Sequence, residues 1–223
     1  MAMTGIKSFT LRGGRMSAAQ EKAYKELSPH YCIPFSAACV DFEAVFGNKN
    51  PVVIEIGFGM GSATARIAAE HPETNYLGIE VFKAGVGKML WEIERGALKN
   101  IRIIEHDAAE VIAAMVPEQS AAGFHVFFPD PWPKKRHHKR RLIQRPFTDR
   151  LAARLKTGGY IYAVTDWPDY AAAARAALSA TPLLANVYGE YAPRLPWRPH
   201  TKFEKKAQAA GRAIYELYFV REG

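Results

Sequence analysis

The chain has 223 residues, of which 48% are hydrophobic and 23% charged, and its formal net charge is +8. This length fits one large domain or one domain with extensions, and the composition is ordinary for a soluble globular protein. No run of about 18 apolar residues occurs, so we expect no membrane span, and because Lys7, Arg12 and Arg15 interrupt the N-terminal segment we expect no secretory signal.

Residues 1–40 are predicted to form an irregular arm with one helix, ahead of a single domain over residues 41–223. Ser17 and Gln20 make a capping-box pattern that predicts a helix from residue 17 to about residue 27, and the prolines at 29 and 34 are expected to break it. The two cysteines, Cys32 and Cys39, suggest neither a disulfide framework nor a zinc site. We expect both to be reduced, in a cytoplasmic protein.

From residue 51 onward, strand-like apolar runs alternate with helix-like segments. Strands are predicted over residues 52–56, 75–79, 101–104, 124–128 and 160–165, and helices over residues 62–71, 83–98, 107–116, 145–155 and 171–178, with Gly158-Gly159 closing the fourth of these helices. Two late strands, 183–188 and 214–220, are predicted to pair antiparallel. The alternation predicts an α/β fold with a mostly parallel seven-stranded sheet, helices on both faces and one antiparallel strand near the C-terminus.

In such sheets, ligands bind outside the carboxyl ends of the strands. Gly57, Glu80, Asp107, Asp130 and Asp166 all fall at the ends of predicted strands. Acidic side chains are therefore expected to line one rim of the sheet.

The first strand leads into a glycine-rich turn, Glu55-Ile56-Gly57-Phe58-Gly59-Met60-Gly61. Its Gly-x-Gly-x-Gly spacing differs from the Gly-x-Gly-x-x-Gly of dinucleotide pyrophosphate sites. A buried Glu55 would repel a pyrophosphate but could hold a cationic or amine-bearing ligand, such as S-adenosylmethionine. Glu80 could accept hydrogen bonds from both ribose hydroxyls, as in NAD sites, and Asp107 could accept from an adenine amino group, cap the next helix, or do both.

The fourth strand leads directly into Pro129-Asp130-Pro131-Trp132-Pro133 and then into a basic run, Lys134 to Arg141. Prolines restrict their own backbone and that of the preceding residue, so Asp130 and Trp132 should be held firmly. The basic run carries six of the net positive charges and leaves only +2 for the rest of the chain. Such concentration favours a nucleic-acid partner, although a solvated loop is the alternative. Trp132 either packs beneath the turn or stacks on a flipped base.

With these motifs, the chain resembles the bacterial tRNA (guanine-N7)-methyltransferases, which act on the variable-loop guanosine. The matching residues cover most of the chain: Arg12-x-Gly14-Arg15-Met16-Ser17, Glu55-Ile56-Gly57-Phe58-Gly59, Gly78-Ile79-Glu80-Val81, Phe127-Phe128-Pro129-Asp130-Pro131-Trp132-Pro133-Lys134, His137-x-Lys139-Arg140-Arg141, Thr165-Asp166 and Thr201-Lys202-Phe203-Glu204. The resemblance implies a Rossmann-like class I methyltransferase fold, S-adenosylmethionine as methyl donor, tRNA as partner, and neither a metal nor an obligate protein partner.

The resemblance also implies roles for individual residues. The methyl donor would be bound by Glu55, Gly57, Gly59, Glu80, Asp107 and Asp130, and Asp130 would also be the catalytic residue. The target guanosine would be bound by Lys134, Asp166, Thr201, Lys202, Phe203 and Glu204, and the RNA by Arg136, His137, His138, Lys139, Arg140 and Arg141. Lys202 stands where the family often has arginine, and a lysine keeps the charge but lacks the bidentate fork.

The chemistry of this reaction limits what Asp130 has to do. Guanine N7 carries a free lone pair, so no general base is required. The enzyme must place N7 in line with the methyl group and the sulfur, at about 3–3.5 Å before attack. A fixed carboxylate would favour the positive charge that develops on the purine, and could also orient guanine by accepting from its N1–H or amino group.

Three other functions compete with this hypothesis. Methyltransferases that act on exocyclic amines use Asp/Asn-Pro-Pro-aromatic motifs, and the sequence Asp130-Pro131-Trp132 lacks the doubled proline. An NAD-dependent oxidoreductase is disfavoured by Glu55 and by the glycine spacing. A non-catalytic RNA-binding protein on the same fold is disfavoured by the complete set of acids at the strand ends.

Overall fold

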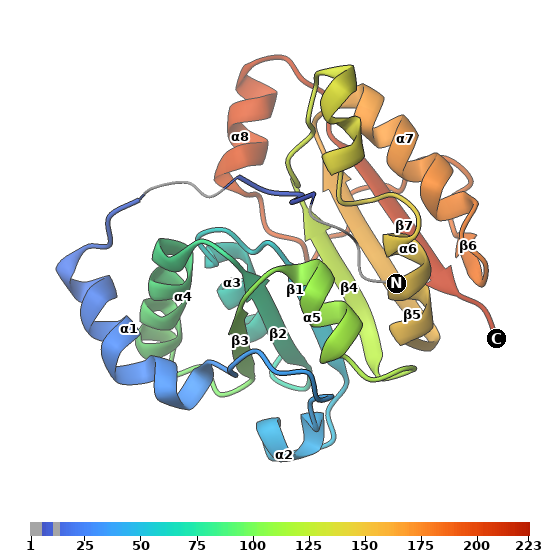
Figure 1. Cartoon of the computed structure of the whole chain (residues 1–223). Coiled ribbons are helices and arrows are strands. Elements are labelled where there is room, and N and C mark those ends of the chain that lie inside the picture. Colours follow the sequence, from blue (N-terminus) through green and yellow to red (C-terminus); the bar gives the residue numbers. More distant parts are fainter. Residues whose placement is uncertain (1–5, 11–13) are drawn as a thin grey trace.

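The computed structural model describes residues 6–10 and 14–223, so the resemblance at Arg12 lies outside the described residues. Strands and helices alternate along most of this part of the chain (Figure 1). The strands are β1 (Val52–Ile56), β2 (Asn75–Glu80), β3 (Ile101–Glu105), β4 (Ala121–Phe127), β5 (Leu155–Thr165), β6 (Leu184–Asn186) and β7 (Tyr215–Arg221). The α-helices are α1 (Ala18–Tyr31), α2 (Phe42–Phe46), α3 (Ser62–Glu70), α4 (Lys83–Gly96), α5 (Ala108–Ala114), α6 (Phe147–Arg154), α7 (Pro168–Ser179) and α8 (Lys202–Ala209), and η1 (Lys135–Arg140) is a 3-10 helix.

The strands form one seven-stranded sheet in the order β3-β2-β1-β4-β5-β7-β6. Strands β1 to β5 pair in parallel, whereas β7 runs antiparallel to both β5 and β6. This confirms the predicted α/β fold and its antiparallel strand near the C-terminus. The strand order reverses between β1 and β4, and such a switch point opens a crevice at the carboxyl ends of the two strands. The glycine turn after β1 and the Asp130 turn after β4 therefore meet at the same place.

Helices cover both faces of the sheet because successive strand residues point to opposite sides. Val52, Ile54 and Ile56 of β1 belong to the core that includes residues of α5, α6 and α7. Val53 belongs to the second core, which is formed with α1, α3 and α4. Glu55 shares the side of Val53, so its carboxylate points toward α3. None of the described helices is long and apolar enough to cross a membrane.

Helix α1 packs on α4 rather than standing apart as an arm (Figure 1). Its Ser17–Gln20 capping box is present, as predicted. Ala23 is buried in the second core, and the Ile33 amide donates to the Ile103 carbonyl at 2.8 Å. The domain boundary at residue 40 stays a prediction, but the described residues that precede it belong to the same packed body.

Two predictions about helix ends are wrong. Helix α1 continues through Pro29 to Tyr31, because a proline so close to a helix end disrupts few hydrogen bonds. The glycines at 158 and 159 do not close a helix; they lie inside β5, whose pairing with β4 is irregular between Leu155 and Tyr160. Gly158 has φ +77°, so these two glycines form a bulge in the strand. The short elements α2 and η1 were not predicted.

Gly85 of α4 brings this helix against the glycine turn. A Cβ atom at residue 85 would lie 2.0 Å from the Gly59 carbonyl oxygen. That neighbour is backbone, so the turn itself would have to move. The close approach of α4 thus fixes the position of the turn.

We expect Gly85→Ala to lower the free energy of unfolding by about 1–3 kcal/mol, because it overpacks this contact. Gly96→Ala in the same helix is the matched control: the nearest neighbour of its Cβ would be the Leu98 side chain, at 3.1 Å, and not backbone, and alanine favours helix by about 1 kcal/mol over glycine. Chemical denaturation of both variants measures the difference. Equal stabilities would contradict the proposed contact.

Candidate active site

The glycine turn leaves open space on its outer side. Gly57, Gly59 and Gly61 have φ of +74°, +59° and +72°, a region that residues with a Cβ atom rarely adopt. A Cβ at Gly57 or Gly59 would meet no other atom within 4 Å, whereas one at Gly61 would lie 2.7 Å from Met89. Gly61 is thus needed for packing, and Gly57 and Gly59 can be approached closely by a ligand.

Glu55 lies buried beneath this turn. Its carboxylate is 3% exposed and accepts a hydrogen bond from the Thr64 hydroxyl at 2.7 Å. Burial raises the pKa of Glu55 to about 7, the Thr64 hydrogen bond lowers it, and the charge of Glu80 adds to the rise. A buried carboxylate of this kind favours a ligand that brings a positive charge.

Glu80 joins the glycine turn after β1 to the loop after β2 through backbone hydrogen bonds. Its Oε2 accepts from the Gly59 amide at 2.7 Å, and its Oε1 accepts from the Val81 and Phe82 amides at 2.7 and 3.0 Å. Burial raises the pKa of Glu80 above its ordinary value, although the three backbone hydrogen bonds lower it. The nearby charge of Asp130 adds to the rise. Glu55, Glu80 and Asp130 are therefore close enough to interact electrostatically.

Asp107 and Asp166 each have a cationic partner. Asp107 caps α5 by accepting from the Ala109 amide at 3.0 Å, and its other oxygen lies 3.0 Å from Lys7 Nζ. Asp166 pairs with Arg212 at 2.9 Å. The cap predicted for Asp107 is confirmed, while the ligand contact predicted for it stays a prediction. Both acids lie at strand ends, on the rim predicted from the sequence.

The Asp130 turn is held by more than its prolines. Phe128 and Trp132 both adopt left-handed backbone, with φ of +52° and +47°, which is costly for residues other than glycine. Arg141 offsets this cost by donating from Nε to the Pro131 carbonyl at 2.9 Å, while its Nη2 donates to Asp169. The Arg141 side chain is only 5% exposed. It therefore stabilises the turn, and the RNA contact predicted for it stays a prediction.

Trp132 packs against the N-terminal segment and the basic run. Its Nε1 donates to the Ser8 carbonyl at 2.9 Å, and the Arg140 guanidinium lies 3.8 Å from the centre of its ring. Arg140 also donates to the carbonyls of Lys7 and Phe9. The packing alternative predicted for Trp132 is confirmed, and Arg140 is engaged by the described N-terminal segment.

The remaining members of the basic run point outward. Lys134, Lys135, Arg136 and Lys139 are exposed, and His137 and His138 are half-buried. Because η1 turns tightly, six consecutive residues gather on one short element. Four exposed cations beside the Asp130 turn form a positive surface, which we call the basic ledge. Among the described residues, no cluster of three or more His, Cys, Asp or Glu side chains suited to a metal ion occurs.

The segment Thr201 to Glu204 forms the N-terminal end of α8. The Thr201 hydroxyl caps the helix by accepting from the Glu204 amide at 3.1 Å. Phe203 is 60% exposed, and its ring centroid lies 6.5 Å from that of Phe128, with the planes 23° apart. Thr201, Lys202 and Phe203 are thus accessible near the Asp130 turn.

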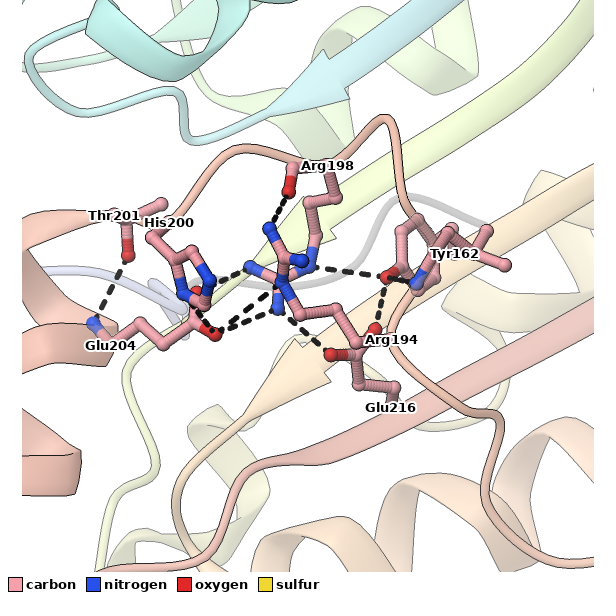
Figure 2. A network of polar contacts seen from close by, with 8 residues as sticks. Tyr162, Arg194, Arg198, His200, Thr201, Glu204 and Glu216 are labelled. Carbon is pink, nitrogen blue, oxygen red and sulfur yellow. Dashed lines mark hydrogen bonds and ion pairs between the residues drawn. The ribbon is translucent and has the colours of Figure 1, made fainter.

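Glu204 points the other way, into the protein. It is 1% exposed and accepts from both Nη atoms of Arg198, at 2.8 and 3.1 Å (Figure 2). Burial alone would raise the pKa of Glu204, but the hydrogen bonds and charge of Arg198 hold it below its ordinary value. This placement does not favour the predicted direct contact between Glu204 and guanine.

The sequence interpretation missed the partners of Glu204. Arg198 and Glu216 are both buried, and Tyr162 contacts both. A signal existed for Glu216, since it is a charged residue inside the apolar strand sequence Tyr215-Glu216-Leu217. No comparable signal marks Arg198, which follows Trp197 in an irregular segment.

The chain is similar to known methyltransferases. A family model described as "Putative methyltransferase" matches residues 49–217. A "tRNA (guanine-N(7)-)-methyltransferase" of Treponema pallidum (strain Nichols) is 48% identical, over 98% of this chain and 97% of the relative. A protein of the same name from Burkholderia pseudomallei (strain 1710b) is 50% identical, over 97% of this chain and 82% of the relative.

Among solved structures, a 16S rRNA adenine-N1 methyltransferase from Catenulisporales acidiphilia, determined with its cosubstrate SAM, superposes with a TM-score of 0.54. It is 16% identical, and the match covers 80% of this chain and 88% of that structure. At this identity the likeness concerns the fold.

We expect Arg141→Met to lower the free energy of unfolding by about 1–3 kcal/mol, since it leaves the Pro131 carbonyl without its donor. Lys135→Met on the exposed side of η1 should change it by less than about 0.5 kcal/mol. Urea denaturation of the two variants measures this contrast. A fully stable Arg141→Met protein would mean that the turn holds its shape without the arginine.

Proposed function

The chain belongs to the tRNA (guanine-N7)-methyltransferase family, and from this premise we propose that it methylates N7 of the variable-loop guanosine of tRNA, with S-adenosylmethionine as methyl donor. The observation that carries the proposal is identity of about half the residues, over 97–98% of the chain, to relatives named for this reaction. The substrate also implies a cytoplasmic location. The pocket, the basic ledge and α8 then each have a place in the reaction.

The pocket between the glycine turn and the Asp130 turn suits the methyl donor. Gly57 and Gly59 leave room for close approach of a ligand. Glu55 would face the α-ammonium group of the donor, and Glu80 would face its ribose hydroxyls. Asp107 would face the adenine end, where the adenine amino group would replace Lys7 as its partner. When bound, the donor supplies an electrophilic methyl group on a sulfonium.

The basic ledge suits the RNA backbone. Lys134, Lys135, Arg136 and Lys139 are exposed together beside the pocket, and cations that neutralise phosphates gain affinity by releasing counterions. An enzyme that modifies a base within folded RNA has to extrude that base. The exposed ring of Phe203 offers a stacking surface for such a base, and Asp166, Thr201 and Lys202 would contact the same base.

Asp130 contributes by electrostatics and orientation. Since N7 attacks through a free lone pair, Asp130 has no proton to remove. The turn that carries it is held by Arg141, so the carboxylate is fixed before the reaction begins. A preorganised negative charge favours the positive charge that appears on the purine as the methyl group moves.

Nucleoside analysis tests the product. Transcribed tRNA treated with the protein and methyl-labelled donor should yield labelled 7-methylguanosine, and a tRNA whose variable-loop guanosine is replaced by adenosine should accept none. In single turnover, Asp130→Asn should be about 100-fold slower or worse, while S-adenosylhomocysteine still binds. Glu118→Gln, on an exposed side chain, is the control.

If the label appeared in a nucleoside methylated on an exocyclic amine, N7 would not be the methylated atom. If no methyl group were transferred, the protein would be better described as a non-catalytic RNA binder. A near-normal rate for Asp130→Asn would remove Asp130 from its proposed role.

Donor affinity should depend on pH through Glu55. Its pKa of about 7 means that the free protein holds a largely neutral Glu55 at pH 6 and a charged one at pH 8. A ligand ammonium favours the charged form, so affinity should rise about fivefold to tenfold from pH 6 to pH 7.5. Above about pH 8 it should fall again, as the ammonium of the ligand loses its proton.

Calorimetric titration with S-adenosylhomocysteine across this range measures the dependence. Glu55→Gln should bind weakly and lose the rise between pH 6 and 7.5. Thr64→Val removes the hydrogen bond that lowers the Glu55 pKa, so its rise should move to higher pH. An unchanged profile in both variants would assign the titration to another group.

A further inference from the structure

A buried polar network joins the start of α8 to the sheet (Figure 2). At its centre is Arg198, whose side chain has no exposed surface. Its Nη atoms donate to both oxygens of Glu204 on α8, Nη2 donates to Glu216 on β7 at 2.8 Å, and Nε donates to the Tyr162 hydroxyl on β5 at 3.1 Å. Tyr162 in turn donates to the second oxygen of Glu216. One guanidinium thus connects a helix, α8, to two neighbouring strands of the sheet, β5 and β7.

Further contacts tighten the same region. Arg194 donates to the Arg198 carbonyl, and His200 Nδ1 lies 3.1 Å from Glu204. At the far end of α8, Arg212 pairs with Asp166 at 2.9 Å. Helix α8 is therefore tied to the sheet at both ends, and one tie reaches the carboxyl end of β5.

The cost of the network argues that it does more than stabilise the fold. Removing one cation and two carboxylates from water costs several kcal/mol per ion, and apolar side chains of similar size would often serve stability as well. The charged network also fixes the orientation of α8 on the sheet, because the planar guanidinium of an arginine can donate to its partners in only a few arrangements. The element so directed carries Thr201, Lys202 and Phe203 on its exposed side.

We propose that Arg198 is a positioning residue for the target guanosine. By holding Glu204 inward, it orients the first turn of α8 so that Thr201, Lys202 and Phe203 face the opening beside Asp130. This inference rests on the proposed function. It also gives Glu204 an indirect role, through the helix that it anchors.

Arg198→Lys tests the inference, since lysine keeps the charge and loses the fork. We expect KM for tRNA to rise at least fivefold and kcat/KM to fall at least tenfold. The dissociation constant of S-adenosylhomocysteine, whose pocket lies on other elements, should stay within twofold of the wild-type value. Arg175→Lys, the same change at the exposed pair with Glu190, should leave every constant unchanged.

A second variant covers the case in which Arg198→Lys does not fold. Glu216→Gln alters the network from β7, where the buried residue 216 cannot reach substrate, and should raise KM for tRNA two- to fivefold without weakening S-adenosylhomocysteine binding. A wild-type KM for tRNA in either folded variant would overturn the positioning role. So would an equal loss of affinity for tRNA and for S-adenosylhomocysteine.

The tRNA dissociation constant, measured with S-adenosylhomocysteine present, separates the two proposals. If the wild-type protein transferred no methyl group, the proposed function would fail. A weaker tRNA complex for the Arg198 and Glu216 variants would still support the positioning role in that case, and an unchanged complex would overturn it.

Discussion

The carboxylate of Glu80 holds together two loops at the carboxyl edge of the sheet, the glycine turn after β1 and the loop after β2. It accepts from the Gly59 amide on one side and from the Val81 and Phe82 amides on the other. The contact is possible because β1 and β2 are parallel neighbours that end at the same edge, and because Gly85 lets α4 reach the Gly59 carbonyl. The acidic group that would bind the donor is thus the same group that shapes its pocket.

The basic run, Lys134 to Arg141, likewise combines a structural part with an exposed one. Its last two arginines face inward, where Arg141 supports the backbone of the Asp130 turn and Arg140 lies on Trp132. Its exposed cations face solvent on the same short element. One short segment therefore supports a turn with two strained residues and carries exposed cations beside it.

The chemistry of N7 methylation explains why both turns need to be rigid. Methylation at N7 needs no proton transfer, so the enzyme has little to contribute beyond placing two reactants and stabilising a developing charge. Placement demands that both sides of the pocket be held. On the donor side this is done by Glu80, and on the base side we assign it to the Arg198 network that orients α8. In both cases a buried charged group with several partners does the holding.

The order of elements, the parallel sheet and the family could be predicted from the sequence, because strand and helix periods, glycine spacing and the Asp130 motif are local patterns. Burial of Glu55 and the cap at Asp107 followed from the same patterns. The directions of Arg141, Glu204 and Trp132 could not be predicted, since each is decided by a partner that no local pattern identifies: Asp169, Arg198 and Ser8. Residue type and spacing determine which groups can reach the rim of the sheet. Only the tertiary structure decides which charges turn inward, because a buried ion needs hydrogen-bond partners or an opposite charge that the fold brings to it.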